Sequence, residues 1–260
     1  LHLGTIENPN KKNVIDEINI SLRNIATMGF SQCYVLLLSV LRNKESLAIS
    51  WNTILELIHT IEVFNFRYHT ISAMPANRVE KFYSETAKGI QELVKSEYAE
   101  GRLQSTLRGI NVHFNAILPN SSEFKEKFVT ISYGTSKKAR NRILYILKKF
   151  ELHLVPNHAE ELAFSQNLSI EHLLPQEPSK WGLSEEEVKP YVHKIGNLVL
   201  LGKKLNSEAK NFPINKKIEI LKSSNILSTK SIINDISHHM QWNEDEIIRR
   251  CEIMSEIADK

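Results

Sequence analysis

Two segments of the chain carry side chains that could together hydrolyse a phosphodiester bond. Glu171 and His172 supply a carboxylate and an imidazole at adjacent positions, and Asn197 and Asn206 add amide groups further along the chain. Such hydrolysis needs a water that gives up a proton and a cation that neutralises the charge developing on the phosphoryl group. A neutral imidazole accepts protons near pH 7, and carboxylate and amide oxygens bind hard cations such as Mg²⁺. We therefore expect these residues to form one metal-assisted hydrolytic site.

The apolar pattern around these residues predicts the elements that position them. Residues 168–174 form a short apolar-rich run that ends at Pro175, and a second run covers residues 197–201. We predict two strands joined by a long polar loop, followed by a helix over residues 203–210 that carries Asn206. Two strands and a helix would then converge on one ion.

The adjacency of Glu171 and His172 raises a geometric question. Neighbouring side chains of a regular strand point to opposite faces of the sheet. The two residues can share a site only if the strand twists or ends there, and Pro175 favours such an end.

The rest of the chain is predicted to be helical. Apolar residues recur at helical spacing in the first part, among them Ile15, Ile18, Leu22, Ile25, Ile54, Ile58 and Ile61. The Pro, Asn and Ser residues at 118–122 are typical of a boundary. We therefore predict a mainly α protein with a small α+β element, in which residues 1–120 form a helical linking or regulatory region. Residues 121–260 would form the domain that contains the site, with its core motif at 168–222.

The composition is that of an ordinary globular protein. Of the 260 residues, 42% are hydrophobic and 24% charged, and we find neither an apolar run long enough to cross a membrane nor a signal peptide. The two cysteines, Cys33 and Cys251, lie far apart and indicate neither a Cys-rich metal site nor a disulfide scaffold. We expect a cytoplasmic protein. Because the chain begins with Leu rather than Met, we also expect it to be part of a longer protein.

Two basic segments flank the candidate site. The net charge is only +3, yet residues 136–150 carry six Lys and Arg residues and no acid, and residues 194–222 carry seven lysines against two glutamates. Such blocks suit a phosphate backbone, although a solvated helix face is the alternative. The residues that we expect to bind nucleic acid are Lys137, Lys138, Arg140, Arg142, Lys203, Lys204 and Lys216.

The motifs of the second half resemble one known family when they are taken together. Glu-His-x-x-Pro-Gln stands at 171–176, His-Lys-Ile-Gly-Asn-Leu-Val-Leu-Leu at 193–201, Leu-Asn at 205–206 and Asn-Phe-Pro-x-x-Lys at 211–216. This spaced set is similar to the HNH (His-Me finger) domain at the C-terminus of GmrSD-type, modification-dependent restriction endonucleases. The resemblance covers residues 121–260. Glu171 departs from the aspartate that many nucleases with this finger carry.

The resemblance implies a ββα-metal nuclease that cuts or nicks DNA in bacterial defence. His172 would activate the water, Glu171 and Asn206 would bind the divalent cation (Mg²⁺, with Mn²⁺ or another ion as a substitute), and Asn197 would orient the site. The resemblance also implies that a ParB-like nucleotide-hydrolysing domain lies upstream and is a partner of this segment.

Several alternatives stay open at this stage. Asn197 could serve only to make a turn after Gly196. The domain could be a non-catalytic DNA-binding or regulatory module with the same fold, and RNA could replace DNA, because a finger that grips a backbone contacts few base edges. The sequence does not define the oligomeric state, the DNA modification that is sensed, or whether one strand or both are cut.

Overall fold

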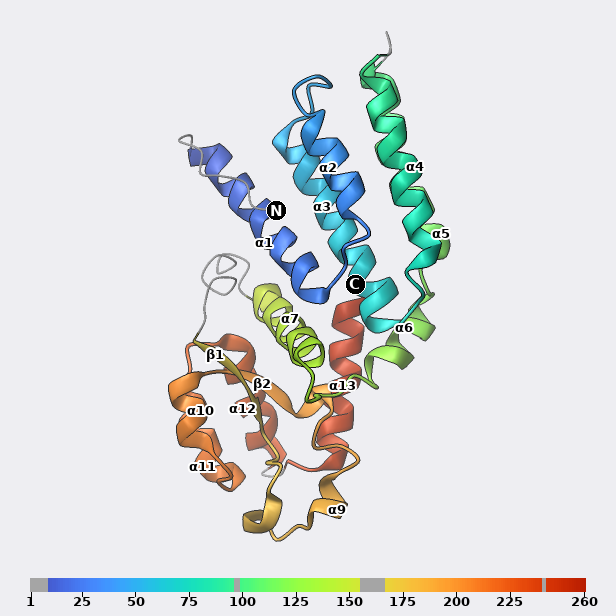
Figure 1. Cartoon of the computed structure of the whole chain (residues 1–260). Coiled ribbons are helices and arrows are strands. Elements are labelled where there is room, and N and C mark those ends of the chain that lie inside the picture. The colour runs from blue at the N-terminus through green and yellow to red at the C-terminus, as the bar shows by residue number, and fades with distance from the viewer. Residues whose placement is uncertain (1–8, 96–98, 155–166, 240–241) are drawn as a thin grey trace. The chain divides into compact units, whose positions relative to one another are not determined.

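The computed structural model describes residues 9–95, 99–154, 167–239 and 242–260. The chain forms two compact units, Leu1–Asn120 and Ser121–Lys260. Figure 1 shows helices throughout and one small sheet, which lies in the second unit.

The first unit is built from helices that pack side by side. They are α1 (Pro9–Met28), α2 (Tyr34–Arg42), α3 (Trp51–Asn65), the π-helix η1 (Phe66–Ile71), α4 (Asn77–Leu93) and α5 (Ala99–Ile117). Helix α1 packs against α3, α2 against α4, and α5 against both α3 and α4. The apolar residues predicted at helical spacing form this core: Ile18, Ile25, Ile58 and Ile61 are fully buried.

Buried polar groups fix the helix packing of the first unit. Ser39 of α2 donates a hydrogen bond to the carbonyl of Ala87 in α4 over 2.8 Å. The amide of Asn24 in α1 donates to the buried carboxylate of Glu62 in α3 over 3.0 Å. Buried polar groups require such partners, so these bonds favour one arrangement of the helices over others.

The second unit surrounds a two-stranded antiparallel sheet with helices. Strand β1 (Leu168–His172) pairs with β2 (Leu198–Gly202), with Glu171 opposite Val199 and His172 opposite Leu198. Helices α10 (Lys203–Ala209), α7 (Lys137–Leu154) and α12 (Leu227–His239) pack against the strands. The remaining elements are α6 (Ser121–Phe128), η3 (Pro178–Trp181), α9 (Glu185–Val188), η4 (Ile195–Asn197), α11 (Ile214–Lys222) and α13 (Glu244–Asp259).

The expected mainly α fold with a small α+β element is confirmed, and the two strands of that element are antiparallel. The first strand ends at His172, two residues before the predicted end, and the second runs one residue further, to Gly202. The helix that carries Asn206 covers Lys203–Ala209, close to the predicted 203–210. No helix in the described part of the chain combines the length and the apolar character that crossing a lipid bilayer requires.

Candidate active site

The side chain of Asn197 joins the end of β1 to the loop that precedes β2. It makes four hydrogen bonds: Oδ1 accepts from the Leu174 amide (2.8 Å) and the Trp242 indole (2.9 Å), and Nδ2 donates to the carbonyls of Leu174 (2.9 Å) and Val192 (2.7 Å). The residue is fully buried. Its amide group therefore positions the segments that follow His172 and precede His193, and has no remaining donor for a ligand.

Gly196 lies where the chain passes against α13. A Cβ atom at this position would come within 2.1 Å of the Ile247 carbonyl and 2.8 Å of the Cys251 sulfur. The Gly196 amide also donates to the Cys251 sulfur over 3.2 Å. Only glycine permits this approach, which explains why glycine precedes Asn197 in the motif.

The His172 ring is held between a second histidine and a tyrosine. His172 Nε2 lies 3.2 Å from Nδ1 of His193. The Tyr133 ring meets the His172 ring edge-on, with centroids 5.0 Å apart, and stacks on the His193 ring at 6.1 Å. On the other side of the ring, Nε2 of Gln176 lies 3.5 Å from His172 Nδ1.

Burial keeps the two imidazoles neutral. Desolvation lowers the pKa of His172 from 6.5 to about 3, with further lowering by the nearby His193 and Lys217. Desolvation also lowers the pKa of His193, which is more exposed than His172. At neutral pH both rings therefore carry one hydrogen each, and His172 is in the form that can accept a proton.

The Glu171 carboxylate forms an ion pair with a lysine of α11. Lys217 Nζ donates to Glu171 Oε1 and to the His172 carbonyl, both over 2.6 Å. Lys217 is 1% exposed and Glu171 8% exposed. One ammonium group thus fixes both the carboxylate and the last backbone carbonyl of β1.

Burial opposes the charges of this pair. Desolvation raises the pKa of Glu171, against the lowering effect of Lys217, and desolvation lowers the pKa of Lys217, against the raising effect of Glu171. Each charge is therefore held in place chiefly by the other. The strand alternation anticipated from the sequence is also visible in these partners, since Glu171 engages α11 whereas His172 engages Tyr133 and His193.

The residues expected to hold a metal offer a sparse set of oxygen donors. A carboxylate has about four lone-pair positions, so the bond from Lys217 to Oε1 leaves Glu171 able to bind a cation. Asn206 is half-buried on α10, which packs against β1. Within the described ranges, no three His, Cys, Asp or Glu side chains are grouped to hold an ion. The chemistry of Glu171 and Asn206 fits a single hard cation that keeps several waters.

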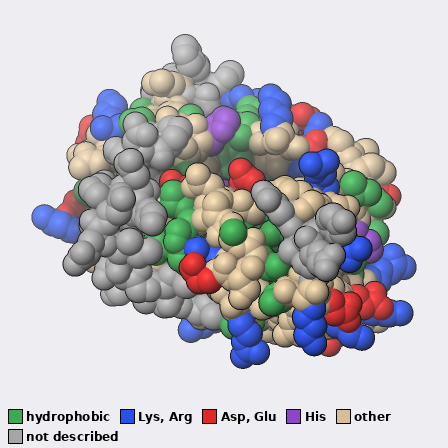
Figure 2. All heavy atoms as spheres, turned by 90° about the horizontal axis from the view of Figure 1, so that it is seen from above, with side chains coloured by type: hydrophobic (Ala, Val, Ile, Leu, Met, Phe, Trp, Pro, Cys, Tyr) green, Lys and Arg blue, Asp and Glu red, His purple; other side chains and the backbone are tan. Residues whose placement is uncertain are grey.

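Most of the residues expected to bind nucleic acid are exposed. Lys137, Lys138 and Arg140 lie in the first turn of α7, and Arg140 lies over the Tyr133 ring at 6.0 Å. Lys203, Lys204 and Lys216 of the later segment are exposed as well. Figure 2 shows Lys and Arg side chains scattered among Asp, Glu and other side chains on the face that it presents.

Arg142 differs from the other basic residues of α7. It is half-buried, and desolvation lowers its pKa. Its Nε is buried and finds no hydrogen-bond partner among the described residues. A role for Arg142 in binding DNA therefore stays a prediction, as do the roles of the exposed residues.

Sequence reasoning singled out neither Lys217 nor Tyr133, and His193 entered only as part of a motif. A signal for Lys217 was present, because it stands three residues after Ile214 and four before Leu221, on the buried face of α11. The neighbouring Lys216, which was predicted to contact phosphate, is exposed. The contacts of His193 and Tyr133 with His172 join segments far apart in the chain, so no local pattern marks them.

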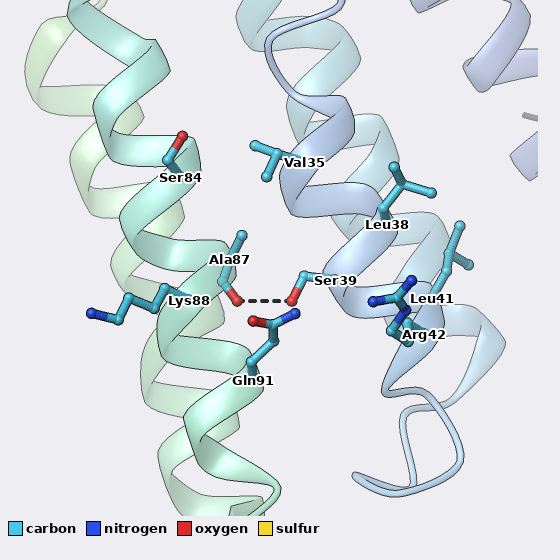
Figure 3. A pocket seen from close by; sticks show the side chains of 9 residues that line it. All are labelled: Val35, Leu38, Ser39, Leu41, Arg42, Ser84, Ala87, Lys88 and Gln91. Atoms are coloured by element: carbon cyan, nitrogen blue, oxygen red, sulfur yellow. Dashed lines mark hydrogen bonds between the residues drawn. The ribbon is translucent and has the colours of Figure 1, made fainter.

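A cavity in the first unit contains no comparable chemistry. It lies between α2 and α4, has a volume of about 680 Å³, and is drawn in Figure 3. Its lining is Val35, Leu38, Ser39, Leu41, Arg42, Ser84, Ala87, Lys88 and Gln91. None of these is an acid, an imidazole or a thiol, so the candidate site stays in the second unit.

The second unit is therefore an α+β domain in which helices pack against a two-stranded sheet, and the first strand of this sheet ends with Glu171 and His172, with His193 beside His172. A family model described as GmrSD restriction endonucleases, C-terminal domain, matches residues 118–257, more than half of the chain. The chain belongs to this family, which confirms the resemblance inferred from the motifs. No curated protein sequence matches the chain at a significant level.

Membership in this family implies a restriction-endonuclease role with DNA as substrate. The expected nuclease class is confirmed at that level.

Proposed function

We propose that residues 121–260 form a metal-dependent DNA endonuclease of the HNH type, in which His172 accepts the proton of the attacking water. The observation that carries this proposal is the placement of His172. Its ring is buried at the end of β1 and fixed by His193 and Tyr133, in a domain of a restriction-endonuclease family. An imidazole that is neutral and oriented in this way has the form required of a general base.

The strongly lowered pKa of His172 is compatible with this role. A pKa of about 3 describes the domain without nucleic acid. A phosphate brought next to the ring adds a negative charge, which favours the imidazolium and raises the pKa. Substrate binding would thus strengthen the base at the moment when it is needed.

The proposed cation would be held by Glu171 and Asn206. Bound there, Mg²⁺ or Mn²⁺ would neutralise the negative charge of the phosphoryl group. Lys217 keeps the Glu171 carboxylate charged and in one place, and Asn197 holds the strand end against the loop before β2. The exposed basic residues of α7 would contact the DNA backbone.

In the cell, this activity would serve bacterial restriction of modified or foreign DNA. We further propose that the protein acts in the cytoplasm and that a ParB-like nucleotide-hydrolysing domain lies upstream of this segment in the complete protein. One observation favours a second candidate, a DNA-binding module without catalysis. The Glu171 carboxylate already has a lysine as its counter-charge, so the site does not depend on a metal to neutralise it.

Nicking of supercoiled plasmid in Mg²⁺, Mn²⁺ or EDTA separates these functions. We expect cleavage that EDTA abolishes. His172→Ala should lower turnover on the order of 10²–10⁴-fold while the protein stays folded and keeps its DNA affinity, and Asn206→Ala should raise the metal concentration for half-maximal activity. His153→Ala, at an exposed position of α7, is the control.

Two outcomes would contradict the nuclease assignment at this site. One is a folded His172→Ala variant that cuts at the wild-type rate. The other is a wild-type protein that binds DNA but leaves the plasmid intact with every divalent cation, which would support the binding module.

A further inference from the structure

The contact between the two imidazoles has a consequence for the chemistry of His172. When both rings are neutral, each has one N–H and one nitrogen lone pair. The 3.2 Å contact between His172 Nε2 and His193 Nδ1 therefore requires one hydrogen between the two nitrogens. Either His172 donates through Nε2 and keeps its lone pair on Nδ1, or His193 donates and His172 carries its hydrogen on Nδ1.

Gln176 distinguishes the two arrangements. Its amide nitrogen lies 3.5 Å from His172 Nδ1, and an amide NH₂ can only donate. A hydrogen on His172 Nδ1 would face this donor, whereas a lone pair there can accept from it. The long contact is weak, but it favours the arrangement in which the His172 hydrogen is on Nε2.

The backbone around His193 is built to hold its ring in this position. The His193 carbonyl accepts hydrogen bonds from the Tyr133 amide (2.7 Å) and the Ser132 hydroxyl (3.2 Å). Asn197 Nδ2 binds the preceding carbonyl, that of Val192. The Tyr133 ring stacks on the His193 ring. These contacts restrain the backbone of His193 on both sides and one face of its ring.

We infer that His193 is a positioning residue that accepts the Nε2 hydrogen of His172 and thereby leaves His172 Nδ1 as the basic nitrogen. The placement of the hydrogen stands on the contacts above, while its value for catalysis rests on the proposed function of His172. A general base that takes a proton from a nucleophile needs a further group that selects its tautomer and orientation. In this site the neutral imidazole of His193 is that group.

Two substitutions separate hydrogen bonding from packing. Asn at position 193 places Oδ1, an acceptor, close to where Nδ1 stands in histidine, because both atoms are bonded to Cγ. Leu at the same position has a similar branch without an acceptor. His193→Leu should therefore lower kcat of nicking on the order of 10–100-fold with little change in KM, and His193→Asn should retain most of the activity. His153→Leu, at an exposed position of α7, is the matched control.

The tautomer itself is measured by nitrogen-15 NMR on the full chain with labelled histidine. The signals of His172 are identified by their loss in His172→Gln. We expect the hydrogen of His172 on Nε2 in the wild type and in His193→Asn, and loss of that preference in His193→Leu. This measurement needs neither DNA nor metal, so it decides the hydrogen placement even if the chain proves not to be a nuclease.

Each result then has one meaning. A wild-type His172 with its hydrogen on Nδ1 overturns the inference, and so does a folded His193→Leu that cuts at the wild-type rate while His172→Ala is inactive. If His193→Leu fails to fold, the wild-type tautomer and the activity of His193→Asn decide instead. Absence of wild-type cleavage, together with the expected tautomer, would overturn the proposed function but not the role of His193 in orienting the ring.

Discussion

Removal of the buried ammonium of Lys217 should destabilise the second unit strongly. Lys217→Met keeps most of the side-chain volume but leaves Glu171 buried without a counter-charge and the His172 carbonyl without its donor. At the 2.6 Å separation of Nζ and Oε1, the Coulomb attraction is ~6 kcal/mol at an effective dielectric constant of 20. Desolvation of both groups offsets much of this. The loss of one partner of such a pair costs about 3–5 kcal/mol.

A double-mutant cycle tests the origin of this loss. Once Glu171→Gln has removed the negative charge, Lys217→Met leaves no unpaired charge, so the second substitution should cost about 2 kcal/mol less than it does alone. The free energy of unfolding that Lys217→Met loses should also become smaller as the pH falls. Without Lys217, the Glu171 carboxyl has a pKa raised further above its value in the unfolded chain. Its protonation at low pH therefore favours the folded state.

Urea unfolding followed by tryptophan fluorescence measures these free energies. A Trp51→Phe background leaves Trp181 and Trp242, both of the second unit, as the reporters. Lys222→Met, at an exposed position at the end of the same helix, should stay within about 0.5 kcal/mol of the wild type. Equal stability of Lys217→Met and Lys222→Met, or a cycle without coupling, would refute the buried ion pair.

Three further predictions concern acid stability, salt dependence and the close approach of the chain at Gly196. The pKa of His172 lies at about 3 in the folded state, below its ordinary 6.5, so its contribution to stability is complete above pH 6.5 and is lost as the pH falls towards 3. The full loss is about 5 kcal/mol, and urea unfolding at pH 8 to 4 should show a flatter profile for His172→Gln. Simultaneous replacement by Ala of the exposed residues of α7 should flatten the slope of log affinity for DNA against log salt by up to ~0.9 per residue; these are Lys137, Lys138 and Arg140. The control replaces three exposed lysines of the first unit, Lys81, Lys88 and Lys95, by Ala. An unchanged slope after the α7 replacements, or an equal change of slope in the control, would show that α7 makes no phosphate contacts. In Gly196→Ala the added Cβ would meet the Ile247 carbonyl, so this substitution should lower the free energy of unfolding by roughly 3 kcal/mol or more. The control is Gly89→Ala, where the added Cβ lies in open space on α4. This second substitution should raise the free energy of unfolding by up to about 1 kcal/mol.

The helical character of most of the chain was predictable because it depends on local spacing. The apolar residues at intervals of three and four, such as Ile54, Ile58 and Ile61, are the ones buried in α3. The strands at 168–172 and 198–202 were also visible as short apolar runs next to Pro and Gly. The exact strand ends were harder to predict, because they depend on hydrogen bonds with another segment. The Leu173 amide, for example, donates to the Asn197 carbonyl outside the regular pairing of β1 with β2.

Sequence alone determined the family, since the motifs of residues 171–216 keep their spacing whatever the surroundings, and it singled out His172 as the candidate base. It left open whether Asn197 binds a ligand or holds the backbone. The structure places that amide in four internal hydrogen bonds, which a pattern of letters cannot reveal.

Only the tertiary structure decided which side chains surround His172 and Glu171. His193 follows His172 by 21 residues and Lys217 follows Glu171 by 46, and Tyr133 belongs to the loop before α7. Their meeting depends on how the sheet, α11 and the loop before β2 pack. Lys216 and Lys217 show the physical reason most clearly. The two lysines are adjacent in sequence, yet rotation of about 100° per residue around the α11 axis leaves Lys216 in solvent and buries Lys217 against the Glu171 carboxylate, which balances its charge.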